Sequence, residues 1–206
     1  MPSILIAGAT ESDSEQFRQK AANILDSSMG SVKFVSGNRD APIIMVEFRS
    51  QLCPWSTDFR LNVFPKLKEK YIDSGKIFFA SIPYAHDDGD AYVMGLSLCS
   101  TNETFWPLVN ELYEKRESYA RVREKGREIS SDNHEVVHQI LGKYGIGPSE
   151  RESCLADNSS KEFLIFARQL SNHLGAYGTP QYLINGKLYH ELSWSDIEWL
   201  FGELSD

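Results

Sequence analysis

Two short apolar segments joined by an amphipathic helix constrain the fold of this chain more than any other feature. Residues 43–48 (IIMVEF) and 77–82 (IFFASI) are short and rich in β-branched or aromatic side chains, which is typical of buried strands. Between them, apolar side chains recur at helical spacing from Pro54 to Tyr71, and Asp73-Ser74-Gly75 ends the helix. A strand, helix, strand unit of this length places its two strands in parallel.

The remainder of the chain predicts helices, a hairpin and a last helix. Helical periodicity runs through residues 86–175 without a strand pattern. Residues 181–184 and 187–190 then flank Asn185-Gly186, a pair that strongly favours a β-hairpin. The sequence therefore predicts an α/β fold in which an all-helical block separates two groups of strands.

Length and composition fit one soluble domain that carries an insertion. The chain has 206 residues, of which 41% are hydrophobic and 24% charged, so it can bury a core. Its formal charge of −8 argues against a nucleic-acid partner. No apolar run approaches the roughly 20 residues of a membrane span. The start, MPSILIAGAT, lacks a basic residue before its apolar run, so we expect a cytoplasmic protein or a mature or engineered chain.

Cys53 stands where the first predicted strand ends and a helix begins. Pro54 suits the first helical position because the helix does not need its missing N–H, which puts Cys53 at the N-cap. The free N–H groups and the positive end of the helix dipole favour a thiolate there. Two interpretations stay open from position alone: a reactive nucleophile, or a buried and inert cysteine.

Four segments in order resemble a known family. They are VEFRSQLCPWS, FPKLKEKYIDSGK, the helical block and GTPQYLINGK, and together they resemble the DsbA-like thiol:disulfide oxidoreductases over approximately residues 31–206. The resemblance implies a thioredoxin-like fold with an inserted all-helical domain. Its expected divisions are a thioredoxin-like domain at 31–85 and 176–206 and the inserted helical domain at 86–175. Residues 1–30 precede the resemblance, and apolar residues at helical spacing there predict an N-terminal helical extension.

The same resemblance assigns roles to residues around the cysteine. It implies that Cys53 attacks the disulfide of a substrate and that Pro180 is a cis-proline packed beside it. A cis bond would expose the backbone of Thr179 to pair with an extended substrate peptide. Pro54 and Trp55 follow Cys53, and Trp55 is expected to contact substrate rather than build core.

Glu47 corresponds to a carboxylate that lies beneath the active site in that family. Strand alternation places it opposite Val46 and Phe48 within a sheet covered on both sides, where burial would raise its pKa. It could then exchange protons with the thiol. The alternative is a carboxylate that reaches solvent or a partner at the strand end.

Ser56 departs from the family pattern, which has a second cysteine at this position to resolve the mixed disulfide. A serine cannot close a bridge with Cys53. Three explanations are open: an engineered substitution, a natural monothiol enzyme resolved by glutathione or another thiol, or lost redox activity with a retained binding groove. No cofactor is expected beyond such a thiol co-substrate.

The other two cysteines, Cys99 and Cys154, fall on predicted helices of the insert. They are either two core residues or a structural disulfide, and a disulfide would indicate an oxidising compartment. By family resemblance we expect a periplasmic or otherwise extracytoplasmic location, while a cytoplasmic one stays open.

The segment His134-Glu135-Val136-Val137-His138 matches the pattern of zinc proteases, with two histidines one helical turn apart. Solvated residues at the start of a helix are the favoured explanation, since five-residue patterns this loose occur by chance and no third ligand is marked. We therefore predict no metal site.

The sequence thus predicts a DsbA-like, monothiol thiol:disulfide oxidoreductase or isomerase. Its expected partners are unfolded or disulfide-containing polypeptides and a redox partner protein, with no nucleic acid and no membrane span. The alternative of another class is a non-catalytic peptide-binding or chaperone-like module. A glutathione-dependent transferase or isomerase of the kappa type is disfavoured by GTPQYLINGK and by a cysteine in first position.

Overall fold

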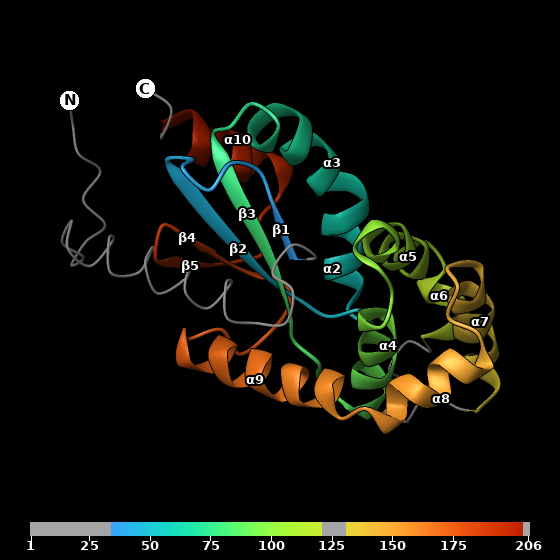
Figure 1. The fold of residues 1–206 in the computed structure, drawn as a ribbon. Coiled ribbons are helices and arrows are strands. Elements are labelled where there is room, and N and C mark those ends of the chain that lie inside the picture. Colours follow the sequence, from blue (N-terminus) through green and yellow to red (C-terminus); the bar gives the residue numbers. More distant parts are fainter. Residues whose placement is uncertain (1–33, 121–130, 204–206) are drawn as a thin grey trace.

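A computed structural model describes residues 34–120 and 131–203 of the chain (Figure 1). These residues form a central five-stranded sheet flanked by helices, with a group of helices at one end of the sheet. The predicted helical extension at 1–30 lies outside the described residues.

The sheet has the strand order β1-β3-β2-β4-β5. Its strands are β1 (Val35–Ser36), β2 (Ile43–Arg49), β3 (Ile77–Pro83), β4 (Gln181–Ile184) and β5 (Lys187–His190). Strands β2 and β3 are parallel, which confirms the prediction from the strand, helix, strand pattern, and the hairpin β4–β5 is confirmed as well. β1 and β4 pair antiparallel to β3 and β2. The two-residue β1 was not predicted, because it is too short for a periodic signal.

Helices account for most of the remaining described residues. The first is a continuous helical stretch built from α2 (Pro54–Asp58), η2 (Phe59–Val63), α3 (Phe64–Leu67) and η3 (Lys68–Ile72), in which the η segments are π-helical. The others are α4 (Asp88–Leu98), α5 (Asn102–Glu114), α6 (Arg116–Tyr119), α7 (Ser131–Lys143), α8 (Pro148–Ala156), α9 (Ser159–His173) and α10 (Trp194–Glu203).

Helices cover both faces of the sheet because its central strands are buried on both sides. Met45 and Phe79 face the first helical stretch and α10. Val46 and Ala80, the next residues along the same strands, face the opposite side and pack with Ala167 of α9. In Figure 1, α9 runs along one side of the sheet while α3 and α10 lie on the other. The alternation of side chains thus gives a three-layer arrangement.

The helical segment has its own apolar core, built mainly from α4, α5 and α7. Helix α9 is shared: Phe163 packs with Phe105 of α5, whereas Leu170, two turns later, packs against the sheet. A disulfide between Cys99 and Cys154 joins the end of α4 to α8, with the two Cα atoms 6.2 Å apart. The division into domains at 86–175 stays a prediction.

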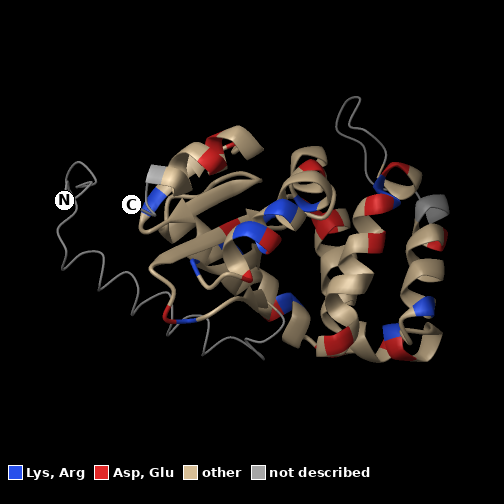
Figure 2. Ribbon diagram, turned by 90° about the horizontal axis from the view of Figure 1, so that it is seen from above, with Lys and Arg blue, Asp and Glu red and all other residues tan. Residues whose placement is uncertain are grey.

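Charged residues are distributed over both parts of the molecule. Figure 2 shows basic and acidic positions interspersed on the helices around the sheet and on the helical segment. Among the described residues, no helix is both long and apolar enough to cross a membrane.

Candidate functional site

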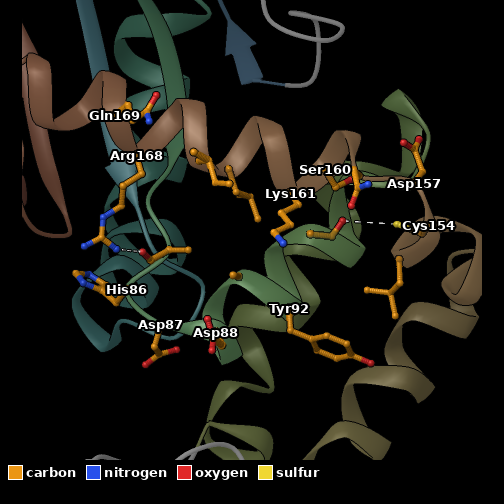
Figure 3. Close-up of a pocket in the computed structure, with 17 residues that line it drawn as sticks. His86, Asp87, Asp88, Tyr92, Cys154, Asp157, Ser160, Lys161, Arg168 and Gln169 are labelled. Carbon is orange, nitrogen blue, oxygen red and sulfur yellow. Dashed lines mark hydrogen bonds between the residues drawn. The ribbon is translucent and has the colours of Figure 1, made fainter.

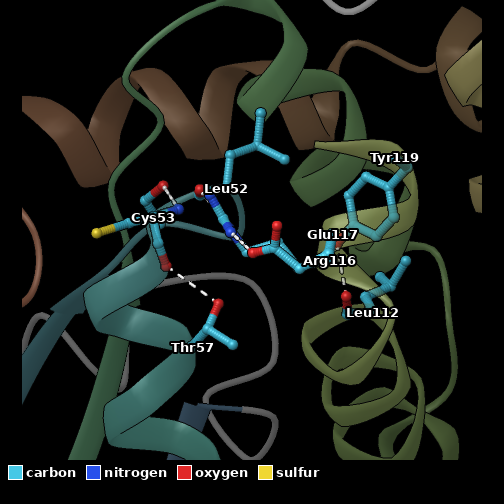
Figure 4. A network of polar contacts seen from close by, with 8 residues as sticks. Leu52, Cys53, Thr57, Leu112, Arg116, Glu117 and Tyr119 are labelled. Carbon is cyan, nitrogen blue, oxygen red and sulfur yellow. Dashed lines mark hydrogen bonds and ion pairs between the residues drawn. The ribbon is translucent and has the colours of Figure 1, made fainter. Parts of the chain in front are cut away.

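Cys53 occupies the N-cap of α2, at the point where β2 has ended and the chain turns into the helix (Figure 4). Its backbone is extended and Pro54 fills the first helical position, as predicted from the sequence. The side chain is partly exposed, and the Sγ atom donates a hydrogen bond to the Thr179 carbonyl oxygen at 3.2 Å. A thiol in this position is accessible and lies at the positive end of the helix dipole.

The wall opposite Cys53 is formed by Thr179 and Pro180, whose peptide bond is cis, the geometry that the family resemblance implies. The Thr179 side chain is held by His86: its Oγ1 lies 2.7 Å from the His86 Nε2 atom. The carbonyl of Thr179 therefore faces the sulfur while its hydroxyl faces away toward the β3–α4 connection. His86 was not expected at the site, since no sequence pattern indicates that residues 86 and 179 meet.

Ser56 is completely buried on the first turn of the helix. Its Oγ accepts a weak hydrogen bond from the Ser50 backbone N–H at 3.4 Å, and the Ser50 Oγ accepts one from the Cys53 N–H at 3.1 Å. These contacts tie the start of the helix to the end of β2. A hydroxyl cannot replace a thiolate as a nucleophile toward a disulfide, so Ser56 has a structural contact here and no redox chemistry.

Asp90, in the first turn of α4, joins the two loops that form the site. Its Oδ1 accepts hydrogen bonds from the Gln51 N–H at 2.9 Å and the Leu52 N–H at 3.3 Å, and its Oδ2 accepts from the His86 N–H at 3.2 Å. The side chain is fully buried, and burial raises the pKa of its carboxyl to about 6. Asp90 thus fixes the backbone before Cys53 and the backbone of His86 at once.

Carbonyl groups of the same loop are held by α5 and α6, and Figure 4 shows the contact between Arg116 and Leu52. The Arg116 Nε donates to the Leu52 carbonyl at 2.7 Å, and the Tyr113 hydroxyl donates to the Ser50 carbonyl at 3.1 Å. Arg116 also pairs with Glu117. The loop that presents Cys53 is therefore bound through its N–H groups by α4 and through its carbonyls by the next two helices.

Glu47 lies in the middle of β2 and is completely buried, so the structure shows the first of the two placements considered from the sequence. Its register partners are Ser81 on β3 and Tyr182 on β4. The Ser81 hydroxyl donates to Oε2 at 2.7 Å, whereas Oε1 has no hydrogen-bond partner among the described residues. Burial raises the pKa of this carboxyl, although Ser81 and nearby arginines oppose the shift.

Two buried arginines accompany Glu47. Arg60, on the helix that starts at Pro54, donates from Nε to the Asn110 Oδ1 at 2.8 Å and stacks 3.9 Å from the Trp106 ring centroid. Burial lowers the pKa of Arg60 to about 10, and the Glu47 carboxylate opposes that shift. Arg49 is also buried and donates to Gln51 at 3.3 Å. Both arginines therefore interact electrostatically with the buried Glu47 carboxylate.

Two exposed aromatic side chains lie close in sequence to Cys53 and to the cis bond. Trp55 is 63% exposed and Tyr177, near the cis bond, is 69% exposed. Pro54 is exposed as well. Large exposed rings at a site are common where a second polypeptide binds.

Comparison with known proteins identifies the family. A thioredoxin family model matches residues 31–200. The chain belongs to the thioredoxin family. One curated relative is a "putative protein-disulfide oxidoreductase" of Rickettsia bellii, which is 30% identical over 74% of this chain and 56% of its own length. Another is a "probable disulfide bond formation protein D" of Bacillus cereus, which is 27% identical over 74% of this chain and 69% of its own length. The chain spans about half the length of the first curated relatives it matches.

Solved structures show which thioredoxin-like fold this is. The crystal structure of alpha-DsbA1 from Wolbachia pipientis superposes with a TM-score of 0.65 at 23% identity, covering 83% of this chain and 88% of that one. The fold is therefore DsbA-like, as the sequence predicted.

Two other features of the sequence lie away from the Cys53 site of this thioredoxin family member. Cys99 is exposed and Cys154 buried, and both belong to the disulfide described above. In α7, the His138 Nε2 lies 2.9 Å from the Tyr92 hydroxyl and the His134 ring stacks on the same tyrosine. Within residues 34–120 and 131–203, no cluster of three metal-ligating side chains occurs.

Proposed function

We propose that the protein is a thiol:disulfide oxidoreductase that exchanges disulfides of polypeptides through Cys53. The observation that carries the proposal is the accessible Cys53 sulfur at a helix N-cap, 3.2 Å from the carbonyl that precedes a cis-proline. The names of the curated relatives and the family membership support it. No other described cysteine is available, because Cys99 and Cys154 are bonded to each other.

The proposed reaction begins when the Cys53 thiolate attacks one sulfur of a client disulfide. The client S–S bond breaks, a bond forms between Cys53 and that sulfur, and the other client sulfur leaves as a thiolate that takes up a proton. The helix N-terminus stabilises the Cys53 thiolate before the attack and again when it leaves. In this proposal the backbone of Thr179 pairs with the extended client chain, which the contact between its carbonyl and the Cys53 sulfur supports.

Ser56 determines how the mixed disulfide between Cys53 and the client is resolved. Because it cannot attack Cys53, an external thiol such as glutathione attacks the mixed disulfide and releases Cys53 as a thiolate. Attack of the Cys53 thiolate on oxidised glutathione instead loads Cys53 with a glutathionyl group and releases the second glutathione as a thiolate that takes up a proton. No further cofactor enters the scheme, and a redox partner protein is an alternative source of the resolving thiol.

We further propose an oxidising, extracytoplasmic compartment. The Cys99–Cys154 disulfide supports this, since structural disulfides persist in such compartments and are rare where thiols are kept reduced. The clients are then unfolded or disulfide-containing polypeptides that pass through the same compartment.

A second candidate function is peptide binding without redox turnover. The exposed rings of Trp55 and Tyr177 favour it, because they would hold an extended polypeptide whether or not Cys53 reacts. An engineered origin of Ser56 leaves both functions open for the chain as it stands.

The test is the glutathione-driven reduction of a peptide disulfide, followed with the wild type and with Cys53→Ala. We expect the wild type to accelerate the reaction and the variant to fall to the uncatalysed rate. Equal rates for both proteins would refute the oxidoreductase proposal. If both also bind the reduced peptide with the same affinity, the peptide-binding function stands instead.

A further inference from the structure

A cavity lies between α4, α8 and α9 (Figure 3). Its volume is about 510 Å³, within the range of pockets that hold small molecules or peptide side chains. Apolar side chains line much of it: Tyr92 of α4, Leu155 of α8, and Leu164 and Ile165 of α9. Leu155 and Ile165 are 54% and 49% exposed, which is unusual for side chains of this kind that gather at one place.

The cavity borders the Cys53 site at His86. His86 lines the cavity, and its Nε2 lies 2.7 Å from the Thr179 Oγ1. The Thr179 carbonyl in turn accepts the hydrogen bond from the Cys53 sulfur at 3.2 Å. An extended chain advances about 3.3 Å per residue, so a polypeptide held at Cys53 and Thr179 reaches His86, at the edge of the cavity, within about two or three residues.

Charges at the rim are mixed in sign. Asp87 and Asp88 stand at the start of α4, while Lys161 and Arg168 come from α9. Arg168 is engaged already, since it donates to the Ala85 carbonyl. Because acidic and basic side chains both line the rim, the pocket does not favour a highly charged anion or cation. It suits a peptide whose polar backbone lies at the rim while an apolar side chain enters the pocket.

We propose that this cavity, the α4–α8–α9 pocket, binds the client polypeptide: it takes a large apolar side chain about two or three residues from the cysteine that Cys53 attacks. The inference rests on the proposed exchange function and adds a sequence preference to it. The occupant is a segment of the client, because His86 at the edge of the pocket contacts Thr179, whose carbonyl contacts the Cys53 sulfur.

Gly95 offers a way to fill the pocket without disturbing the catalytic loop. It lies inside α4, lines the pocket, and a Cβ built there would meet only the Leu164 Cδ1 atom, at 3.8 Å. Glycine is also the poorest helix former after proline, so replacing it favours the helix. Gly95→Leu should therefore fold and occupy the pocket, while Gly95→Ala gains the same helix preference and leaves the pocket open.

The experiment measures the rate at which reduced Cys53 forms a mixed disulfide with peptides that carry an activated disulfide. The peptides differ by leucine or serine at each of the three positions on either side of their cysteine. For wild type and Gly95→Ala we expect leucine at one of these positions to speed capture about tenfold, which partial burial of a leucine side chain provides. For Gly95→Leu we expect leucine and serine peptides to react alike.

A small disulfide without a peptide chain, hydroxyethyl disulfide, separates the two proposals. If it fails to react with Cys53 in the wild type, the exchange function itself is refuted. If it reacts equally with all three proteins but leucine brings no gain in the wild type, only the pocket assignment is refuted. A leucine preference that persists in Gly95→Leu also refutes it, because the apolar contact then lies elsewhere, as at Trp55.

Discussion

Replacing the buried carboxylate of Asp90 by an amide should change stability in a pH-dependent way. Asp90→Asn keeps one oxygen, but the Gln51, Leu52 and His86 N–H groups all donate toward this side chain. At least one of them then faces an NH₂ group, which costs about 1–3 kcal/mol for an unsatisfied buried donor.

In the wild type, the contribution of Asp90 to the free energy of unfolding falls as the pH rises. Burial raises the Asp90 pKa from 3.8 to about 6, so between these values the folded protein binds a proton that the unfolded chain releases. Unfolding is then progressively favoured as pH increases, by about 3 kcal/mol in total for a shift of this size. Below pH 3.8 both states are protonated and the stability from this group is fully present.

Asparagine does not titrate, so the variant lacks this contribution. We expect Asp90→Asn to be clearly less stable than the wild type at about pH 4.5, and the difference to shrink by about 2 kcal/mol at about pH 7.5, because about a third of the total is already lost at pH 4.5. Urea unfolding of both proteins at the two pH values measures it. Asp88→Asn, an exposed carboxylate at the start of the same helix, is the control and should show little difference at either pH. A difference between wild type and Asp90→Asn that is constant or grows with pH would refute the reasoning.

Three further outcomes follow from the same geometry. Ser56→Cys restores a thiol one helical turn from Cys53, and mild oxidation should close a bridge between Cys53 and the introduced thiol, seen in the mass spectrum as the loss of two hydrogens and of alkylation at both positions. The double variant Cys99→Ala/Cys154→Ala should lower the free energy of unfolding by about 2–5 kcal/mol, yet leave the capture rate of a small disulfide unchanged, because the bridge lies in the helical segment. Arg116→Met removes the donor to a loop carbonyl and should cost about 1–3 kcal/mol in urea unfolding, whereas an effect below the error of the method would show that the loop does not depend on it.

The strands, the helix after Cys53 and the hairpin could be predicted because each has a local signal. Residues 43–48 and 77–82 are short apolar runs, and Asn185-Gly186 fixes the turn between two strands. The helix start at Pro54 follows from its missing N–H. Local signals of this kind place Cys53 at a helix N-cap without reference to the rest of the chain.

Contacts between distant segments had no such signal. Asp90 is one of several acidic residues at the start of a predicted helix, where such side chains are normally exposed to solvent. No nearby sequence pattern indicates that the N–H groups of Gln51 and Leu52 donate hydrogen bonds to it. Phe166 lies among the apolar residues that recur at helical spacing in α9, and the sequence alone predicts that it is buried. In the structure its side chain is 41% exposed, because it lies at the edge of the face that α9 packs against the rest of the protein. Partners of this kind depend on the packing of elements far apart in sequence.

The central claim is that Cys53 is the nucleophile toward disulfides, and the mass spectrum of a single capture reaction tests it most directly. Reduced protein with its Cys99–Cys154 bridge intact is mixed with a peptide that carries an activated disulfide, and the adduct is located by digestion under non-reducing conditions. The account predicts one peptide per protein chain, attached to the fragment that contains Cys53 and removed by glutathione. Absence of an adduct, or attachment at Cys99 or Cys154 while Cys53 stays free, would contradict it.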